Sequence, residues 1–155
     1  MHSQFDRKDR QILAALQKHG RISNLELADL VGLSATPCAR RVKALEDSGV
    51  IAGYHAHLDA KKLGLTLMAL VHVSMDKHTP ERFERFEGVM RDCDSVLECF
   101  LITGQSSDYV VKVIVTDMEA YQEFLLGTLT RIEGVTGVHS SFVMRQVINR
   151  QKMPT

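Results

Sequence analysis

Three polar side chains in the first fifty residues have the spacing needed to contact nucleic-acid bases. Thr36, Arg40 and Lys43 are three or four residues apart, so on a helix they share one face. An arginine fork can hydrogen-bond both acceptors of a guanine edge, and a threonine can touch a base or a thymine methyl group. Lys43 is better suited to a phosphate, which fixes affinity and register without reading sequence. This pattern indicates a surface that contacts double-stranded DNA.

The remaining faces of the same helix are predicted to pack against other helices or to carry flanking charge. Cys38, Val42 and Leu45 form an apolar face, which we expect to pack on two preceding helices. Arg41 projects to the flank, and we expect it to contact phosphate or to form an internal ion pair with Glu46 or Asp47. Taken alone, this charged helix is equally consistent with an ordinary solvated face, because short motifs often match by chance.

Capping residues predict that three short helices position this face. Asp6 can cap the first helix, and Ser23 with Glu26 has the spacing of a capping box at the start of the second. Gly32 allows a tight turn, and Ser34 can cap the third helix. We expect buried stripes from the first two helices, namely Ile12, Leu13, Leu16, Leu25, Leu27, Ala28 and Val31. Two helices joined by such a turn make a helix-turn-helix, which favours the DNA-binding interpretation.

Residues 51–63 predict a linker strand between two domains, residues 1–50 and residues 64–155. Ile51, Tyr54 and Leu58 partly alternate with polar residues, as in a strand. His55 and His57 would share one face of that strand, but no third or fourth ligand lies nearby. Because structural zinc requires four ligands, we expect no metal site here.

The second half predicts a β-α-β-β-α-β order, which is the ferredoxin-like sandwich of an α+β protein. The expected strands are residues 67–75, 95–103 and 108–116 and a last strand ending at Val147, with helices beginning at Thr79-Pro80 and at Asp117. Both helices of such a sandwich cover one face of the sheet. Because the strands carry apolar residues on both sides, we expect a homodimer in which two sheets face each other.

Composition narrows the possible functions further. Residues 1–62 contain ten Lys or Arg against seven Asp or Glu, a net of +3, whereas the rest of the chain has a net of −3. A uniformly basic coat is therefore excluded, but the first half can meet phosphate. Cys38, Cys93 and Cys99 show no CxxC spacing and indicate free thiols in the cytoplasm. The longest apolar run, residues 67–71, is too short to span a membrane.

Three stretches together resemble one known family, the leucine-responsive/asparagine-responsive (Lrp/AsnC, feast/famine) regulators. They are LELADLVGLSATPCARRVKALEDSGVI, LDAKKLGL and ITGQSSDYVVKVIVTDMEAYQEFL. The resemblance implies a transcription factor with an N-terminal (winged) helix-turn-helix and a C-terminal amino-acid-sensing sandwich. It also implies dimers that assemble into octamers or similar rings on nucleoid DNA. The recognition helix and its start would then contain Ser34, Thr36, Pro37, Cys38, Arg40, Arg41 and Lys43.

The resemblance further implies an effector pocket between dimers, at the loop between the second and third strands of the sandwich. The family's pattern is Gly, two residues, then Asp-Tyr, and Gly104, Asp108 and Tyr109 fit it with a loop one residue longer. Asp108 can receive the ammonium of a free amino acid, and the loop N–H groups can hold its carboxylate. The expected pocket residues are Thr103, Gly104, Gln105, Ser106, Ser107, Asp108 and Tyr109, with His139, Ser140 and Ser141 from a neighbouring subunit.

Without the resemblance, Asp108 and Tyr109 are more simply a turn-closing aspartate beside a core tyrosine. Two other functions also stay open at this point. One is an architectural DNA-binding protein that ignores small molecules. The other is a small enzyme on a ferredoxin-like fold, although the sequence shows no nucleophile–base pair, metal set or phosphate loop. No cofactor is expected beyond the amino-acid effector.

Overall fold

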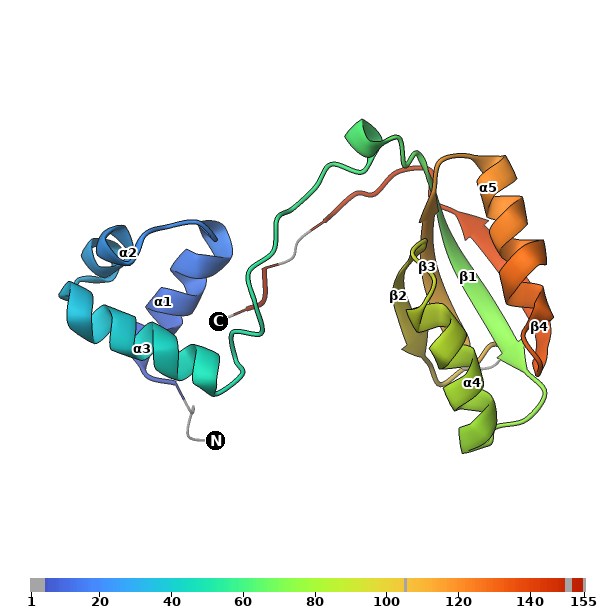
Figure 1. Cartoon of the computed structure of the whole chain (residues 1–155), viewed down its shortest axis with the longest axis horizontal. Helices are drawn as coiled ribbons and strands as arrows, with labels where there is room; N and C mark the ends of the chain where they lie inside the picture. The colour runs from blue at the N-terminus through green and yellow to red at the C-terminus, as the bar shows by residue number, and fades with distance from the viewer. Residues whose placement is uncertain (1–4, 105, 150–151, 155) are drawn as a thin grey trace. The chain divides into compact units, whose positions relative to one another are not determined.

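The computed structural model describes residues 5–104, 106–149 and 152–154, which form two compact units (Figure 1). The first unit contains the described residues up to His57, joined by those that follow Val147. The second unit is Leu58–Val147. The boundary between His57 and Leu58 falls within the expected linker, residues 51–63, and the described residues after Val147 group with the first unit.

The first unit contains the three expected helices, α1 (Arg7–Lys18), α2 (Asn24–Val31) and α3 (Ala35–Asp47). Asp6 caps α1 and forms a capping box with Asp9, whose backbone N–H donates to Oδ1 of Asp6 at 2.9 Å. The capping box of Ser23 and Glu26 is confirmed, because the Ser23 N–H donates to the Glu26 carboxylate at 2.9 Å. These bonds satisfy N–H groups that a helix start leaves unpaired.

The turn between α2 and α3 depends on Gly32, which has φ +64° and ends α2 in the left-handed region. The Leu33 N–H donates to the Ala28 carbonyl at 2.9 Å and closes this turn. Lys8 reaches over from α1 and donates to the Val31 carbonyl, so that a cation sits at the negative end of α2. The turn and its cap fix where α3 begins.

The core of this unit lies between the three helices and contains Ile12, Ala15, Leu27, Ala28, Val31, Cys38 and Leu45. Leu25 was expected in this core, but the expectation is wrong, since Leu25 is 64% exposed. Leu25 and Leu27 are two residues apart on α2, and residues at that spacing do not face the same way. The helix buries Leu27 and therefore turns Leu25 towards solvent.

The linker strand expected in residues 51–63 does not form. All of these residues are described, and the regular element among them is a short 3₁₀ helix, Lys61–Leu63. Tyr54 donates its hydroxyl to the Glu46 carboxylate of α3 at 2.9 Å instead of facing a neighbouring strand. The segment makes no ladder with a described strand of the chain, and a strand needs a partner to satisfy its backbone groups.

The second unit is the predicted ferredoxin-like sandwich, an antiparallel sheet of order β2-β3-β1-β4 with two helical segments. Its elements are β1 (Leu67–Met75), α4 (Pro80–Arg91), β2 (Val96–Leu101), β3 (Tyr109–Val115), α5 (Met118–Glu123) and β4 (Val135–Phe142). A π-helical turn, Phe124–Thr128, and a 3₁₀ turn, Leu129–Arg131, continue α5. The last strand ends at Phe142 and not at Val147 as expected.

One face of this sheet carries the core. Val71 and Val73 of β1, with Val111 and Val113 of β3, are fully buried together with Phe86 of α4. Side chains alternate along a strand, so the pairing register places Leu70, Phe100 and Val110 on the opposite face of the sheet. That face also carries polar groups, including the ion pair of Lys112 with Glu98 at 2.8 Å. It is therefore mixed in character rather than uniformly apolar.

Candidate functional site

The outward face of α3 carries the residues expected to meet DNA. Thr36, Arg40 and Lys43 are exposed, while Cys38 and Leu45 on the reverse are buried. Lys43 pairs with Asp47 one turn on, at 3.3 Å, and both side chains are well exposed. Within the described chain, Arg40 has no hydrogen-bond or ion-pair partner. An exposed guanidinium beside a threonine and a lysine leaves five rigidly arranged donors available to an acceptor-rich partner.

Cys38 does not belong to this surface. Its side chain is 0% exposed and packs in the helical core, and burial raises the pKa of its thiol. The resemblance placed Cys38 in the recognition helix, where a DNA contact would need an exposed side chain. Cys38 instead supports α3 from its buried face, as the apolar set of Cys38, Val42 and Leu45 predicted. Ser34 stands at the N-cap position as expected but makes no capping hydrogen bond with its side chain, and it is exposed. Pro37 follows in the first turn and is half-buried.

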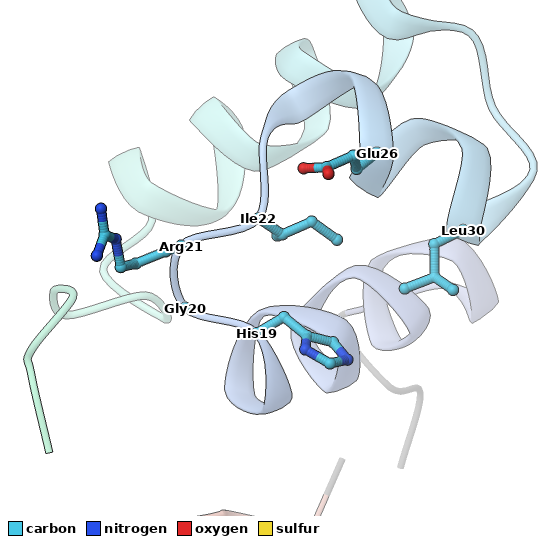
Figure 2. Close-up of a pocket in the computed structure, with 6 residues that line it drawn as sticks. All are labelled: His19, Gly20, Arg21, Ile22, Glu26 and Leu30. Carbon is cyan, nitrogen blue, oxygen red and sulfur yellow. The ribbon is translucent and has the colours of Figure 1, made fainter.

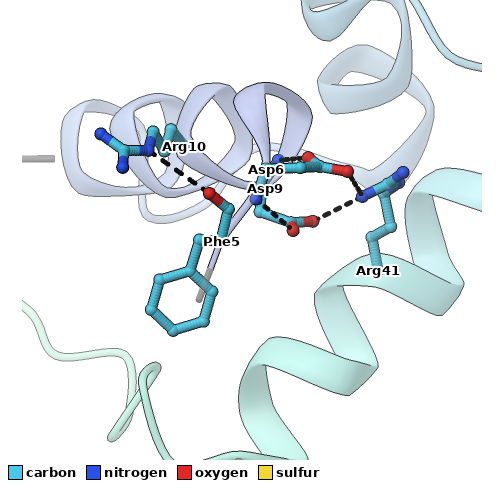
Figure 3. A network of polar contacts seen from close by, with 5 residues as sticks. All are labelled: Phe5, Asp6, Asp9, Arg10 and Arg41. Carbon is cyan, nitrogen blue, oxygen red and sulfur yellow. Dashed lines mark hydrogen bonds and ion pairs between the residues drawn. The ribbon is translucent and has the colours of Figure 1, made fainter. Parts of the chain in front are cut away.

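Arg41 forms an internal ion pair, but with partners other than those expected. Its Nη1 lies 2.8 Å from Oδ2 of Asp6 and 2.7 Å from Oδ1 of Asp9, both at the start of α1 (Figure 3). Hydrogen bonds to Asp9 and Asp6 raise the pKa of Arg41. The Asp9 backbone N–H and then Arg41 lower the pKa of Asp6. Arg41 is thus paired with two carboxylates inside the helical domain, and phosphate contact is not its role in this structure.

The candidates proposed from sequence for Arg41 have other partners. Glu46 accepts from Tyr54, and Asp47 pairs with Lys43. Asn24 also anchors α3, because its amide donates to the Ala35 carbonyl at 2.9 Å. An acid three residues after the N-cap is a weak sequence signal for Asp9, whereas no comparable signal marks Asn24.

Asp108 lies at the end of the loop between β2 and β3, and both of its carboxylate oxygens have partners. The Met75 backbone N–H donates to Oδ2 at 2.7 Å, and Nε2 of His78 lies 2.8 Å from Oδ1. The Asp108 side chain is 21% exposed and that of His78 is 68% exposed. Asp108 therefore ties the loop to the end of β1. His78 occupies the position at which a ligand cation would meet this carboxylate.

Tyr109 belongs to the core and not to the surface of the loop. It is buried, its hydroxyl donates to Glu87 at 2.8 Å, and its ring contacts Phe86 with centroids 4.4 Å apart. Burial raises the pKa of Tyr109 well above its usual value. The expectation that Tyr109 contacts an effector is corrected, and the simpler alternative of a core tyrosine is the one observed.

The remaining loop residues are mostly accessible. Thr103, Gly104 and Ser106 are exposed, and Ser107 is half-buried with its hydroxyl 3.3 Å from Nδ1 of His72. The φ of Gly104 is not positive, so this glycine does not use the left-handed backbone region that favours its residue type. A Cβ at Gly104 would meet no atom within 4 Å, so the loop leaves open space at this position. Gln105 lies outside the described residues.

The three candidates on β4 do not share one surface. His139 stands opposite His72 in the register of β1 and β4, with ring centroids 6.4 Å apart, so it lies on the same face as the loop contact of His72. Ser141 is also exposed. Ser140 points the other way and hydrogen-bonds the Tyr121 hydroxyl among the helices. Because neighbouring strand residues alternate, Ser140 is removed from the candidate pocket.

A shallow concavity of about 690 Å³ lies elsewhere, at the turn between α1 and α2 (Figure 2). It is lined by His19, Gly20, Arg21, Ile22, Glu26 and Leu30, none of which is a predicted site residue. The Glu26 carboxylate there already serves the capping box, and its hydrogen bonds to Ser23 lower the pKa of Glu26. Its known hydrogen bonds thus assign Glu26 to helix capping.

Two broader features concern ions and membranes. Among the residues that the structure describes, no three His, Cys, Asp or Glu side chains gather closely enough to hold a metal ion. No helix in the described ranges is long and apolar enough to cross a bilayer.

Comparison with known families matches both units. Residues 5–52 match the family described as winged helix-turn-helix DNA-binding, and residues 68–153 match the Lrp/AsnC ligand binding domain. These ranges contain α3 with its exposed face and the Asp108 loop, respectively. The order of the two matches is the order of the two halves of the chain.

Individual relatives agree over nearly the whole length. The Bkd operon transcriptional regulator of Pseudomonas aeruginosa is 43% identical over 98% of this chain and 99% of its own length. The leucine-responsive regulatory protein of Escherichia coli is 43% identical, over 92% of this chain and 87% of its own. A transcriptional regulator from Neisseria meningitidis, solved in complex with L-Met, has a TM-score of 0.92 at 39% identity and covers 97% of this chain and 96% of its own. The chain therefore belongs to the Lrp/AsnC family of DNA-binding transcriptional regulators, a family of regulators and not of enzymes.

Proposed function

We propose that this protein is a sequence-specific transcriptional regulator whose binding to double-stranded DNA responds to a free amino acid. The observation that carries the proposal is the two-sided character of α3. Thr36, Arg40 and Lys43 face solvent, while Cys38 and Leu45 anchor the reverse side. A helix held in this way can enter a major groove without losing its packing.

The proposed division of labour on α3 follows from the chemistry of each side chain. Arg40 reads a guanine edge through its bidentate fork, and Thr36 contacts a base or a thymine methyl group. Lys43 exchanges Asp47 for a phosphate, which adds affinity without sequence preference. Two copies of α3 in a dimer would read half-sites about one helical turn apart.

The proposed effector site is the loop that ends at Asp108. An α-ammonium would take the place of His78 at Oδ1, and exposed loop N–H groups would hold the carboxylate. The L-Met held by the Neisseria meningitidis relative supports a free amino acid as the ligand class. Tyr109 and Ser140 have no part in the proposal, since their side chains are committed to the core.

The proposed assembly is a homodimer built sheet against sheet, with dimers joined into an octamer or a similar ring. Exposed Phe100 and Leu70 on the sheet face opposite the helices support such a contact. An effector bound between dimers would change DNA binding only if it binds two assembly states with different affinity. The protein would act on nucleoid DNA in the cytoplasm.

The recognition surface is tested by comparing Arg40→Ala with Lys43→Ala in DNA binding over a salt titration. We expect Arg40→Ala to reduce discrimination between preferred and random duplexes by about ten-fold or more, as loss of a bidentate base contact does. Lys43→Ala should weaken both duplexes equally and reduce the salt slope by about one. Arg91→Ala, which removes an exposed arginine of α4, is the charge-matched control. Wild-type binding by both α3 variants would refute the assignment.

An architectural DNA-binding protein without an effector is the second candidate function. It is favoured by the contacts of Asp108, whose two carboxylate oxygens already have His78 and the Met75 N–H as partners. A thermal-shift screen with the twenty amino acids separates the two functions. A ligand that binds only the folded protein raises its melting temperature. A response to one or a few amino acids supports the regulator, and no response to any of them favours the architectural protein.

A further inference from the structure

The C-terminal segment lies against the DNA-binding unit. Residues 152–154 group with the three helices, whereas the strand before them belongs to the sandwich. Met153 and Pro154 line a groove of about 510 Å³ whose other walls come from α1 and from residues 50–54. Leu13 and Leu16 supply apolar wall on α1, and Tyr54 supplies it on the other side.

One side chain of α1 holds this segment by its backbone. The Gln17 amide donates to the Met153 carbonyl at 3.2 Å, and the Met153 N–H donates to Oε1 of Gln17 at 2.5 Å. Gln17 thus pairs with both backbone groups of one residue, as a neighbouring strand would. The Met153 side chain is 71% exposed, so the backbone bonds hold the segment and a buried anchor does not. Contacts of this kind are weak enough to open and close readily.

One wall residue of the groove contacts the recognition helix. Tyr54, on its wall, donates its hydroxyl to Glu46 in the last turn of α3 at 2.9 Å. The chain passes between the two units twice, once after His57 and once after Val147. The first passage follows α3 in the chain, and the second precedes segment 152–154.

We infer that the groove between α1 and residues 50–54 is a docking site for the chain's own segment 152–154, and that this docking couples the sandwich to α3. The docked segment makes a second, releasable connection between the sandwich and the DNA-binding unit. Its release would free the groove wall that contacts Glu46. The docking rests on contacts within one unit, whereas the coupling to DNA rests on the proposed function.

The docking is tested by tryptic cleavage of the full chain after Lys152, followed as the mass loss of residues 153–155. Loss of two hydrogen bonds in Gln17→Ala should speed this cleavage about five- to ten-fold. Gln17→Glu keeps the oxygen that accepts from Met153 but loses the amide donor, so its rate should be intermediate. Gln11→Ala removes an exposed glutamine of α1 that makes no side-chain hydrogen bond in the described structure, and it should cleave at the wild-type rate.

Equal rates for wild type, Gln17→Ala and Gln11→Ala would overturn the docking. Protection that disappears on dilution would also overturn it, because the segment would then dock on a second copy. Protection that is independent of concentration supports docking within the chain.

The coupling is tested by repeating the cleavage with saturating sonicated duplex DNA, with binding checked by mobility shift in the same samples. By linkage, DNA should change the wild-type cleavage rate about three-fold or more and leave Gln17→Ala unchanged. Bound DNA with an unchanged wild-type rate would overturn the coupling but not the docking. If DNA is not retarded at all, the proposed function fails and the coupling fails with it, while the comparison without DNA still judges the docking.

Discussion

Nη1 of Arg41 on the recognition helix lies 2.7 Å from Oδ1 of Asp9 on α1, and the Asp9 side chain is mostly buried beneath it. The same guanidinium also reaches Asp6, so two ion pairs connect α3 to the start of α1 (Figure 3). Arg41 is therefore a positioning residue for the surface that carries Arg40.

Breaking this pair should weaken DNA binding without changing base preference. We expect Arg41→Ala and Asp9→Asn each to lower the melting temperature by a few degrees and to reduce affinity for all duplexes alike. The double variant should lose less than the sum of the two, because both single changes remove the same contact between Arg41 and Asp9. Calorimetry and DNA titration of the four proteins provide the measurement. Strictly additive effects would show that the pair does not act as a unit.

Acid should destabilise the helical domain partly through Asp6. Its hydrogen bonds to the Asp9 N–H and to Arg41 lower the pKa of Asp6 in the folded state below the ordinary aspartate value of 3.8. A lowered pKa stabilises the fold above the unfolded value, and this stabilisation is lost as pH falls from about 4 through the folded pKa. Asp6→Asn should therefore lower stability at neutral pH and flatten the acid limb below about pH 4 in thermal melts. A variant whose acid limb matches the wild type would contradict this account.

The pair of His78 with Asp108 predicts competition between the protein and its effector. If an ammonium must displace His78, then His78→Gln should strengthen amino-acid binding several-fold, while Asp108→Asn should reduce it by ten-fold or more. Isothermal titration with L-methionine, the ligand held by a solved relative, measures both effects. His57→Gln, which removes an exposed imidazole outside the sandwich, is the control for loss of a histidine and should bind L-methionine as the wild type does. Weaker binding in His78→Gln would mean that His78 helps to hold the ligand.

The open face of the sheet predicts the oligomeric state. Phe100→Asp places a charge on a side chain that is 50% exposed in the single chain, and it should convert a dimer to a monomer at micromolar concentration. Leu126→Asp, at a side chain that is 52% exposed on the helical side, should leave the dimer intact. Sedimentation velocity distinguishes the two. A wild type that is monomeric at this concentration would refute the sheet-to-sheet contact.

Local signals in the sequence predicted most of the fold. The capping box of Ser23 and Glu26 and the turn at Gly32 need only residues within a few positions, so spacing reveals them. The mostly apolar stretch of residues 67–75 likewise predicted the bounds of β1. The strand expected in the linker failed for the opposite reason, because a strand needs a partner that the local pattern does not supply.

The candidate sites show the same limit. Spacing on one helix was enough to separate exposed Arg40 from buried Leu45, since a helix fixes which residues share a face. Spacing could not show that Tyr109 belongs to the core, because its partners Phe86 and Glu87 are more than twenty residues away. It also gave no reason to connect Gln17 with Met153.

The order of amino acids alone thus determined the helices, the strands and the outward cationic side of α3, all of which follow from short-range periodicity and capping. Only the tertiary structure showed which groups the charged side chains contact. Arg41 pairs with Asp6 and Asp9, and Asp108 contacts His78 and the Met75 N–H. The physical reason is that an ion pair depends on distance in space, and packing brings together groups that lie some thirty residues apart in sequence.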